Sequence, residues 1–171
     1  MKIIINERQL RQIIESENKK KLLSVSADLF YEKWKVILDN YKKKGFDGIK
    51  LIDDVNFYDI KFIDLMVSIN EIFEHIIEVD SDLDLKETRI KSLGNLEYVG
   101  GNLDLEETQI KSLGNLKYVG GRLDLKNTTI NDFGNLKYVG GNLRVSDCPL
   151  DELSDEVIRS QVEIKGVIIR F

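Results

Sequence analysis

Three aspartates recur at a fixed spacing along the chain, and their pattern suggests chemistry more clearly than that of any other side chains. Asp84, Asp104 and Asp124 are 20 residues apart, and each lies between two leucines. Alternation of apolar and polar residues is typical of a strand with one buried face, so the carboxylates are predicted to point outward. In parallel strands stacked about 4.8 Å apart they would form a ladder of like charges. Their repulsion, roughly 1 kcal/mol or less each, calls for compensation.

Two further columns of outward residues are predicted beside this ladder. They contain Asp82, Asn102, Arg122 and Asn142 on one side, and Lys86, Glu106, Lys126 and Ser146 on the other. Arg144 continues the aspartate column. Two interpretations stay open. Either Arg122, Arg144, Lys86 and Lys126 neutralise the carboxylates locally, or the strip, including Glu106, forms a concave acidic surface that meets a basic surface on another protein.

A second candidate array consists of three tyrosines, also 20 residues apart: Tyr98, Tyr118 and Tyr138. With Lys117 and Lys137, they are predicted to lie exposed on the path that returns from one strand to the next. Tyrosine suits protein interfaces, but it is equally suited to lying over a convex surface and burying its ring. The tyrosine array therefore ranks below the acidic strip as a binding surface.

Catalytic and metal-binding residues are not predicted. His75 is the single histidine of the chain, and a metal or catalytic site needs several convergent groups. Cys148 has no histidine near it in sequence and is predicted to face the core, where a reactive thiolate is disfavoured. We expect no catalytic residues, no metal ligands and no cofactor, and the chain is predicted not to be an enzyme.

The elements that position these residues follow from a 20-residue unit written three times over residues 82–141. The copies are DLDLKETRIKSLGNLEYVGG, NLDLEETQIKSLGNLKYVGG and RLDLKNTTINDFGNLKYVGG. A unit this short cannot enclose a core, so the copies must stack and bury a continuous apolar spine. Each unit is predicted to be one short strand plus a return path. Gly114 and the pair Gly120-Gly121 are predicted to form the corners, including positive φ.

The string L-x-L-x-x-T-x-I-x-x-L resembles the leucine-rich repeat signature L-x-L-x-x-N/C-x-L in its short bacterial form. Thr88, Thr108 and Thr128 occupy the slot of that family's asparagine ladder, and Cys148 occupies it in a fourth unit. A small donor there can hydrogen-bond backbone groups that a turn leaves unpaired. The resemblance implies an α+β solenoid with a sheet of short parallel strands. Threonine for asparagine and the inserted Gly-Gly are the two departures from the signature.

The same offsets extend the solenoid over residues 51–171. The predicted units are a 28-residue first repeat (55–82), repeats 83–102, 103–122 and 123–142, a degenerate repeat 143–161 and a C-terminal strand cap 162–171. In the first repeat, apolar residues at three- and four-residue spacing predict an amphipathic helix. They are Leu65, Ile69, Ile72, Phe73, Ile76 and Ile77.

Residues 1–50 carry no repeat and are predicted to form a helical N-terminal cap. Asn6 and Gln9 would cap a first helix with the apolar stripe Leu10, Ile13 and Ile14. A second helix is predicted from about Ser26 to Lys44, with Gly45 as its stop. Capping the solenoid is the favoured interpretation, and docking of a partner through Trp34 and Phe30 is the alternative.

Composition limits the function classes. The chain has 171 residues and a formal net charge of -5, with similar charge in both halves, which argues against nucleic-acid binding. No apolar stretch is long enough to span a membrane, and the start lacks a signal-peptide core. One cysteine excludes an internal disulfide and suits a reducing compartment. A cytoplasmic protein is expected.

These observations predict a non-catalytic scaffold that binds another protein through the solenoid surface. The rival prediction is a structural or assembly protein that self-associates, and the oligomeric state stays open. The blocks LGNLKYVGG and LDL, with the opening MKIIINERQLRQII, also resemble proteins of tailed bacteriophages and their hosts. That resemblance implies an accessory, virion or host-modulating role, with the bacterial host cell or the virion as its location.

Overall fold

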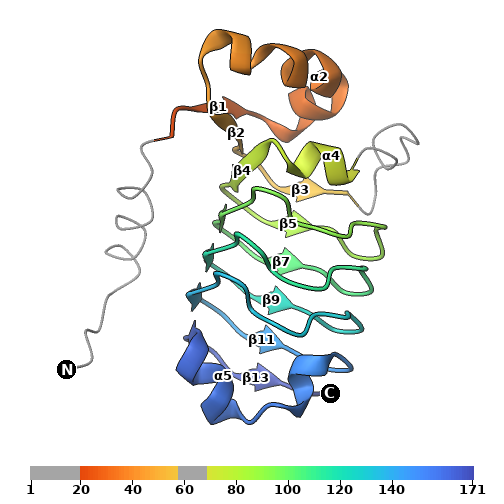
Figure 1. The fold of residues 1–171 in the computed structure, drawn as a ribbon, viewed down its shortest axis with the longest axis vertical. Helices are drawn as coiled ribbons and strands as arrows, with labels where there is room; N and C mark the ends of the chain where they lie inside the picture. The colour runs from red at the N-terminus through yellow and green to blue at the C-terminus, as the bar shows by residue number, and fades with distance from the viewer. Residues whose placement is uncertain (1–19, 58–68) are drawn as a thin grey trace, which may run out of the picture.

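The chain forms a stack of coils with two parallel β-sheets along its length. A computed structural model describes residues 20–57 and 69–171. One sheet has seven strands: β1 (Leu22–Val25), β2 (Gly48–Leu51), β4 (Ile76–Val79), β6 (Tyr98–Val99), β8 (Tyr118–Val119), β10 (Tyr138–Val139) and β12 (Glu163–Ile164). The other has six: β3 (Val55–Asn56), β5 (Leu83–Asp84), β7 (Leu103–Asp104), β9 (Leu123–Asp124), β11 (Leu143–Arg144) and β13 (Ile168–Ile169). The predicted α+β repeat solenoid is confirmed (Figure 1).

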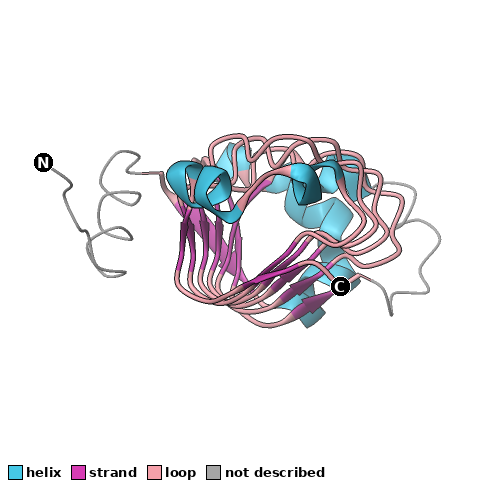
Figure 2. Ribbon diagram, turned by 90° about the horizontal axis from the view of Figure 1, so that it is seen from below, coloured by secondary structure: helices cyan, strands magenta, loops and turns pink. Residues whose placement is uncertain are grey.

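Each 20-residue unit contributes two strands, so the prediction of one strand per unit was wrong. The Leu-Asp pair enters the six-stranded sheet and the Tyr-Val pair enters the seven-stranded sheet. Seen along the stack, the two sheets form two sides of each coil, and loops and helices close the rest (Figure 2). A two-residue strand is too short to give a clear sequence pattern. It exists because the same pair in the next unit lies beside it.

The predicted register is confirmed along the six-stranded sheet. Val55 pairs with Leu83 across the 28-residue first spacing, and Leu83 pairs with Leu103 across a 20-residue spacing. The apolar positions of each unit point inward and form the predicted spine. In the second unit they are Leu105, Ile110, Leu113, Leu116 and Val119, all 0 % exposed. Burial of such side chains, at about 1.5–3 kcal/mol each, is the main source of stability.

The corners of the coil differ in part from the prediction. Gly114 has φ 55°, as expected for a turn that needs the left-handed region. Gly120 is required for another reason, because a Cβ there would lie 2.0 Å from the carbonyl oxygen of Gly100 in the coil before. A further corner was missed: Glu107 has φ 60°, and the equivalent residues of neighbouring units are also left-handed. No glycine marks this corner in the sequence.

Threonine stabilises that missed corner. Thr108 Oγ1 donates to the carbonyl of Leu105 at 2.8 Å, and Thr88 and Thr128 make the same bond at 2.7 Å. The side chains are 2–4 % exposed. The prediction that this slot holds a donor for turn carbonyls is therefore confirmed.

Within the described residues, the helix of the first repeat ends earlier than predicted. Helix α4 spans Ile69–Phe73, and its residues Ile69, Ile72 and Phe73 are buried. Ile76 and Ile77 belong to β4 instead, because the chain must enter the seven-stranded sheet there. Leu65 lies outside the described residues.

The N-terminal region contains the predicted second helix and two strands that were missed. Helix α2 spans Ala27–Asn40, Ser26 Oγ accepts from Leu29 N at its start, and the 3-10 helix η1 (Lys42–Lys44) follows. Gly45 ends it with φ 76°. Strands β1 and β2 flank α2 and extend the seven-stranded sheet, so the region is not purely helical. The predicted first helix lies outside the described residues.

The C-terminal end carries the predicted strands and an unpredicted helix. After the 3-10 helix η2 (Pro149–Glu152), helix α5 spans Asp155–Gln161. Strands β12 and β13 then end the seven- and six-stranded sheets respectively. Arg170 donates to the Leu153 carbonyl and the Asp155 carboxylate, both at 2.7 Å, and so fastens β13 to this helical segment.

Candidate protein-binding surface

The outer side of the six-stranded sheet carries the three predicted columns, and we call it the charged face. Its aspartates are fixed by the backbone. The Oδ1 atoms of Asp84 and Asp104 each accept from the N–H two residues further on, at 2.9 Å. Asp124 does the same at 3.1 Å. This bond shapes the turn that leaves the strand, so each carboxylate has a structural role as well as a charge.

Two arginines compensate the carboxylate ladder. Arg122 Nη2 lies 3.7 Å from Asp104 Oδ2 and 3.6 Å from Asp124 Oδ2, and Arg144 Nη1 lies 3.5 Å from Asp124 Oδ2. The Asp124 side chain is only 2 % exposed, whereas that of Arg122 is 47 % exposed. The ladder is thus locally neutralised at its Asp124 end, and the arginine is its accessible group.

Glu106 is compensated by the third column. Its carboxylate lies 2.9 Å from Lys86 Nζ and 2.7 Å from Lys126 Nζ. The two hydrogen bonds, Lys126 first, lower the pKa of Glu106 to about 2. The lysines and the glutamate therefore form a charged chain across three neighbouring coils.

The carboxylate of Asp104 is harder to ionise than a free aspartate, because its pKa is raised. Burial raises its pKa, and the neighbouring charges of Asp124 and Asp84 add to the rise, against the Glu106 N–H bond and Arg122, which lower it. The free energy of keeping Asp104 ionised is therefore unfavourable. The repulsion expected from the 20-residue spacing contributes to this rise, after burial.

The first column joins neighbouring coils, a role that the sequence analysis missed. Asp82 Oδ1 accepts from the N–H of Asn102, and Asn102 Oδ1 accepts from the N–H of Arg122, both at 2.7 Å. Asn142 Oδ1 accepts from Val167 N at 3.1 Å. The recurring Asp or Asn at this position was the available signal, because these side chains commonly accept backbone bonds.

The charges are not evenly distributed along the charged face. Asp82, Asp84 and Asp104 lie toward its β3 end, and Arg122 and Arg144 lie toward its β13 end. Lysine and glutamate alternate beside them. The face is therefore acidic at one end and basic at the other, and the acidic strip of the second interpretation covers only part of it.

The tyrosine array is buried, so the expectation of an exposed array was wrong. Tyr98, Tyr118 and Tyr138 are 6 %, 1 % and 2 % exposed. Their rings stack at centroid distances of 4.7 and 4.9 Å, with interplanar angles of 10° and 7°. The rings belong to strands β6, β8 and β10 rather than to a loop, and strand spacing brings them into contact. We call these three residues the tyrosine stack.

The helical docking site is also altered by the structure. Phe30 is 0 % exposed and belongs to the core, and Trp34 is partly buried against it. Phe30 faces the core because α2 covers one end of the stack (Figure 1). It cannot contact a partner without unfolding of α2.

His75 and Cys148 have structural environments. His75 Nδ1 lies 2.8 Å from the Tyr41 hydroxyl, and burial lowers the pKa of this histidine. Cys148 is buried, and burial raises the pKa of its thiol. Among residues 20–57 and 69–171, no group of three or more potential ligands is placed to hold a metal ion.

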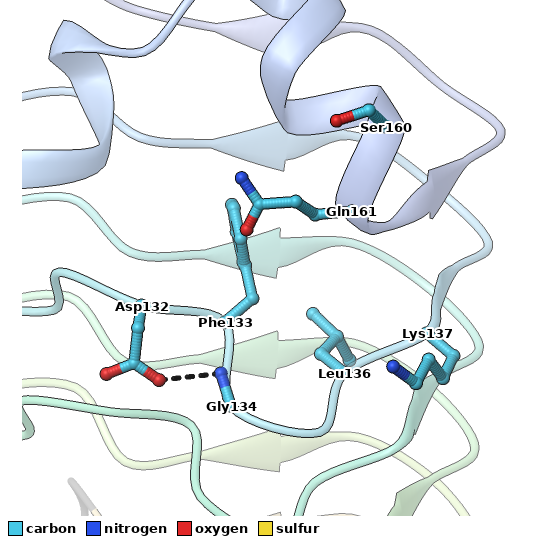
Figure 3. Close-up of a pocket in the computed structure, with 7 residues that line it drawn as sticks. All are labelled: Asp132, Phe133, Gly134, Leu136, Lys137, Ser160 and Gln161. Atoms are coloured by element: carbon cyan, nitrogen blue, oxygen red, sulfur yellow. Dashed lines mark hydrogen bonds between the residues drawn. The ribbon is translucent and has the colours of Figure 1, made fainter.

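A shallow hollow of about 410 Å³ lies beside α5 (Figure 3). Its lining residues are Asp132, Phe133, Gly134, Leu136, Lys137, Ser160 and Gln161. Asp132 Oδ1 already accepts from Gly134 N at 2.7 Å, and Ser160 Oγ donates to the Val157 carbonyl at 2.7 Å. These polar groups hold the local turn and helix together and do not converge on a ligand.

Comparison with known proteins found no match among protein-family models, and none among curated proteins or solved structures. Within the part of the chain that the structure describes, no helix has the length and apolar character that crossing a membrane requires.

Proposed function

We propose that this protein is a non-catalytic scaffold that binds another protein through the charged face. The observation that carries the proposal is the fixed array of charged side chains on the outside of the six-stranded sheet. Asp84, Asp104 and Asp124 are anchored by backbone bonds at each coil. A partner would meet the preorganised Asp84 and Asp104 together with the exposed Arg122, which the buried Asp124 helps to hold, and preorganisation reduces the entropy lost on binding.

The distribution of charge supports a partner of complementary polarity. It would offer basic groups to the end at Asp82 and Asp84 and acidic groups to the end at Arg122 and Arg144. Such complementarity mainly gives specificity and a fast association rate. Because salt bridges within the face satisfy part of its charge, affinity would come from the accessible members, chiefly Arg122 with its 47 % exposed side chain.

The finer identity of the scaffold is part of the same proposal. The Leu-x-Leu and threonine positions support a relationship to leucine-rich repeats, although this chain has two strands in each unit. The resemblance of its sequence blocks to proteins of tailed phages supports an accessory or host-modulating role inside a bacterial host cell. A nucleic acid or a membrane as the main partner is not proposed.

A matched pair of charge reversals tests the proposal. Arg122→Glu changes the charged face, and Lys111→Glu makes the same change of net charge at an exposed position outside the three columns. Each variant is used to capture proteins from an extract of the native host, alongside the wild-type chain. We expect one or more proteins to be captured by the wild type and Lys111→Glu but lost with Arg122→Glu. Equal capture by all three would contradict the proposal.

Self-assembly remains the second candidate function, favoured by one observation. Val167 and Phe171, 59 % and 93 % exposed, flank the edge strand β13. Exposed apolar groups beside a sheet edge are typical of strand-to-strand association. Light scattering over a range of concentrations separates the candidates, because a scaffold stays monomeric whereas an assembly protein increases in mass.

A further inference from the structure

From β4 onward, each coil of the seven-stranded sheet offers two carbonyl groups to the coil that follows it. The Val119 carbonyl accepts from Gly140 N at 2.9 Å, and the Gly121 carbonyl accepts from Gly141 N at 2.9 Å. The same two bonds recur one coil later, where Val139 and Gly141 are the acceptors. These bonds connect one repeat to the next.

Ile164 and Gly166 occupy these two positions in the last coil. Ile164 is paired with Val139, and Gly166 N donates to the Gly141 carbonyl. Their own carbonyls therefore point toward the place that a further coil would fill. β12 is the edge strand there.

One arginine occupies both carbonyls. Arg159 Nη1 donates to the Ile164 carbonyl at 2.6 Å, and Nη2 donates to the Gly166 carbonyl at 2.8 Å. The planar guanidinium presents two donors in a fixed fork. It thus replaces the two backbone N–H groups of a following coil. Arg159 lies in the last turn of α5.

At the other end of the stack, a tyrosine contacts the edge strand of the six-stranded sheet in a similar way. This edge strand is β3. In later coils the carbonyl at this position accepts from the coil before, as Asp84 does from Phe57 N at 2.8 Å. In the first coil the equivalent residue is Asn56. The Tyr31 hydroxyl, from α2, accepts from Asn56 N at 3.0 Å and lies 3.5 Å from the Asn56 carbonyl.

The repeat itself indicates which chain could add to these sheet edges if the two side chains were absent. Coils of this chain pair with one another through these same backbone groups, so a strand from a second copy fits an open edge. Edge strands with available backbone groups are templates for such pairing. Repeat proteins also need distinct terminal elements to stay soluble.

We propose that Arg159 and Tyr31 each close one sheet edge, β12 at the C-terminal end and β3 at the N-terminal end, against strand addition by a second copy of this chain; β1 and β13 are the other two edge strands. Arg159 acts at β12 by occupying carbonyls, and Tyr31 acts at β3 by occupying both polar groups of one peptide residue. The role goes beyond partner binding by the charged face. The two residues would prevent association of two copies through their strand edges.

Arg159→Met tests the C-terminal end, because methionine keeps an aliphatic side chain and removes both donors. The matched control is Arg89→Met, which removes the same charge from an exposed position on the return path. Sedimentation velocity is measured over a range of concentrations. We expect the mass of Arg159→Met to rise about twofold, to that of a dimer or beyond, while Arg89→Met follows the wild type. Association no greater than that of Arg89→Met would overturn the proposal.

Two conservative variants, Tyr31→Phe and Arg159→Lys, distinguish an effect on the sheet edges from a general loss of stability. Tyr31→Phe removes one oxygen atom and is expected to raise association relative to the wild type. Arg159→Lys keeps charge and donors and is expected to associate less than Arg159→Met. If Arg159→Met loses its cooperative thermal transition, Tyr31→Phe decides, and wild-type behaviour of that variant would overturn the proposal.

Discussion

The charged face and the tyrosine stack are built by the same 20-residue repeat and behave in opposite ways. Tyrosine rings 4.7 and 4.9 Å apart contact each other favourably. Carboxylates repeated at the same strand spacing repel, and burial together with that repulsion raises the pKa of Asp104. The aspartate column therefore depends on Arg122 from the adjacent column and on Arg144, which continues the column itself. The same strand spacing thus brings tyrosine rings into favourable contact, whereas carboxylates at that spacing need neighbouring cations to compensate their charge.

The difference separates stability from recognition. The tyrosine stack is 1–6 % exposed and has little surface to offer a partner. On the charged face the Arg122 side chain stays 47 % exposed and the Lys86 side chain 34 %. We therefore expect substitutions in the stack to change mainly folding, and substitutions on the charged face to change mainly association.

Tyr118→Ala has the largest expected effect and tests the apolar side of the comparison. Removing the central ring leaves a gap between Tyr98 and Tyr138, so the free energy of unfolding should fall by about 3 kcal/mol. Urea denaturation measures it. Arg122→Ala is the comparison variant, expected to cost about 1 kcal/mol or less because its ion pairs are exposed and long. Equal losses for the two variants would break the distinction.

Glu106→Gln should lower the free energy of unfolding by about 1 kcal/mol at pH 7, because a carboxylate bonded to two lysines is replaced by a neutral amide. The pKa of Glu106 is lowered to about 2 in the folded protein, against about 4.3 in an unfolded chain. The stabilisation is therefore complete above the unfolded pKa and is lost as the pH falls toward the folded value. Denaturation curves at neutral and acidic pH should show the variant and wild type converging. A difference that does not change with pH would refute this role.

Asp104→Asn has the smallest expected effect and the opposite sign. Asparagine keeps an oxygen that can accept from Glu106 N, while the repulsion from Asp84 and Asp124 disappears. Because the folded pKa of Asp104 is raised, ionisation costs stability as the pH rises through that value. The variant should be more stable by about 0.5 kcal/mol at pH 7 and lose this advantage in acid.

Asp124→Asn is the matched control for that experiment. Asp124 is 1 % exposed and pairs with both Arg122 and Arg144, so its neutralisation should destabilise the fold. Thermal melting of the two variants at one pH is sufficient. A change in melting temperature of the same sign for both variants would show that the unfavourable electrostatic energy is not concentrated at Asp104.

The sequence predicted those parts of the fold that depend on periodic burial. The 20-residue register, the apolar spine, the Thr108 bond and the left-handed Gly114 all follow from fixed offsets between side chains. Helix α2 was also predictable, since Ser26 caps its start and Gly45 ends the 3-10 helix that follows it. The charged columns were found by the same logic, together with the cations that compensate them.

What the sequence did not reveal depends on contacts between coils. Strands of two residues such as β8 are defined by their neighbours, so Tyr118 was assigned to an exposed path instead of a buried stack. The corner at Glu107 has no glycine, because backbone and threonine bonds hold a non-glycine residue in the left-handed region. Helix α5 was missed because Pro149 and the lost Gly-Asn corner indicated decay of the repeat. Helix α5, which begins at Asp155 after the N-cap Ser154, takes the place of the lost return path.

Lysine acetylation footprinting of the protein with and without its captured partner tests the central claim most directly. Lys86 and Lys126 lie on the charged face. Lys117 and Lys137 directly precede Tyr118 and Tyr138 of the tyrosine stack. We predict that the partner slows acetylation of Lys86 and Lys126 and leaves Lys117 and Lys137 unchanged. Protection of Lys117 and Lys137 alone would contradict the assignment of the charged face as the binding surface.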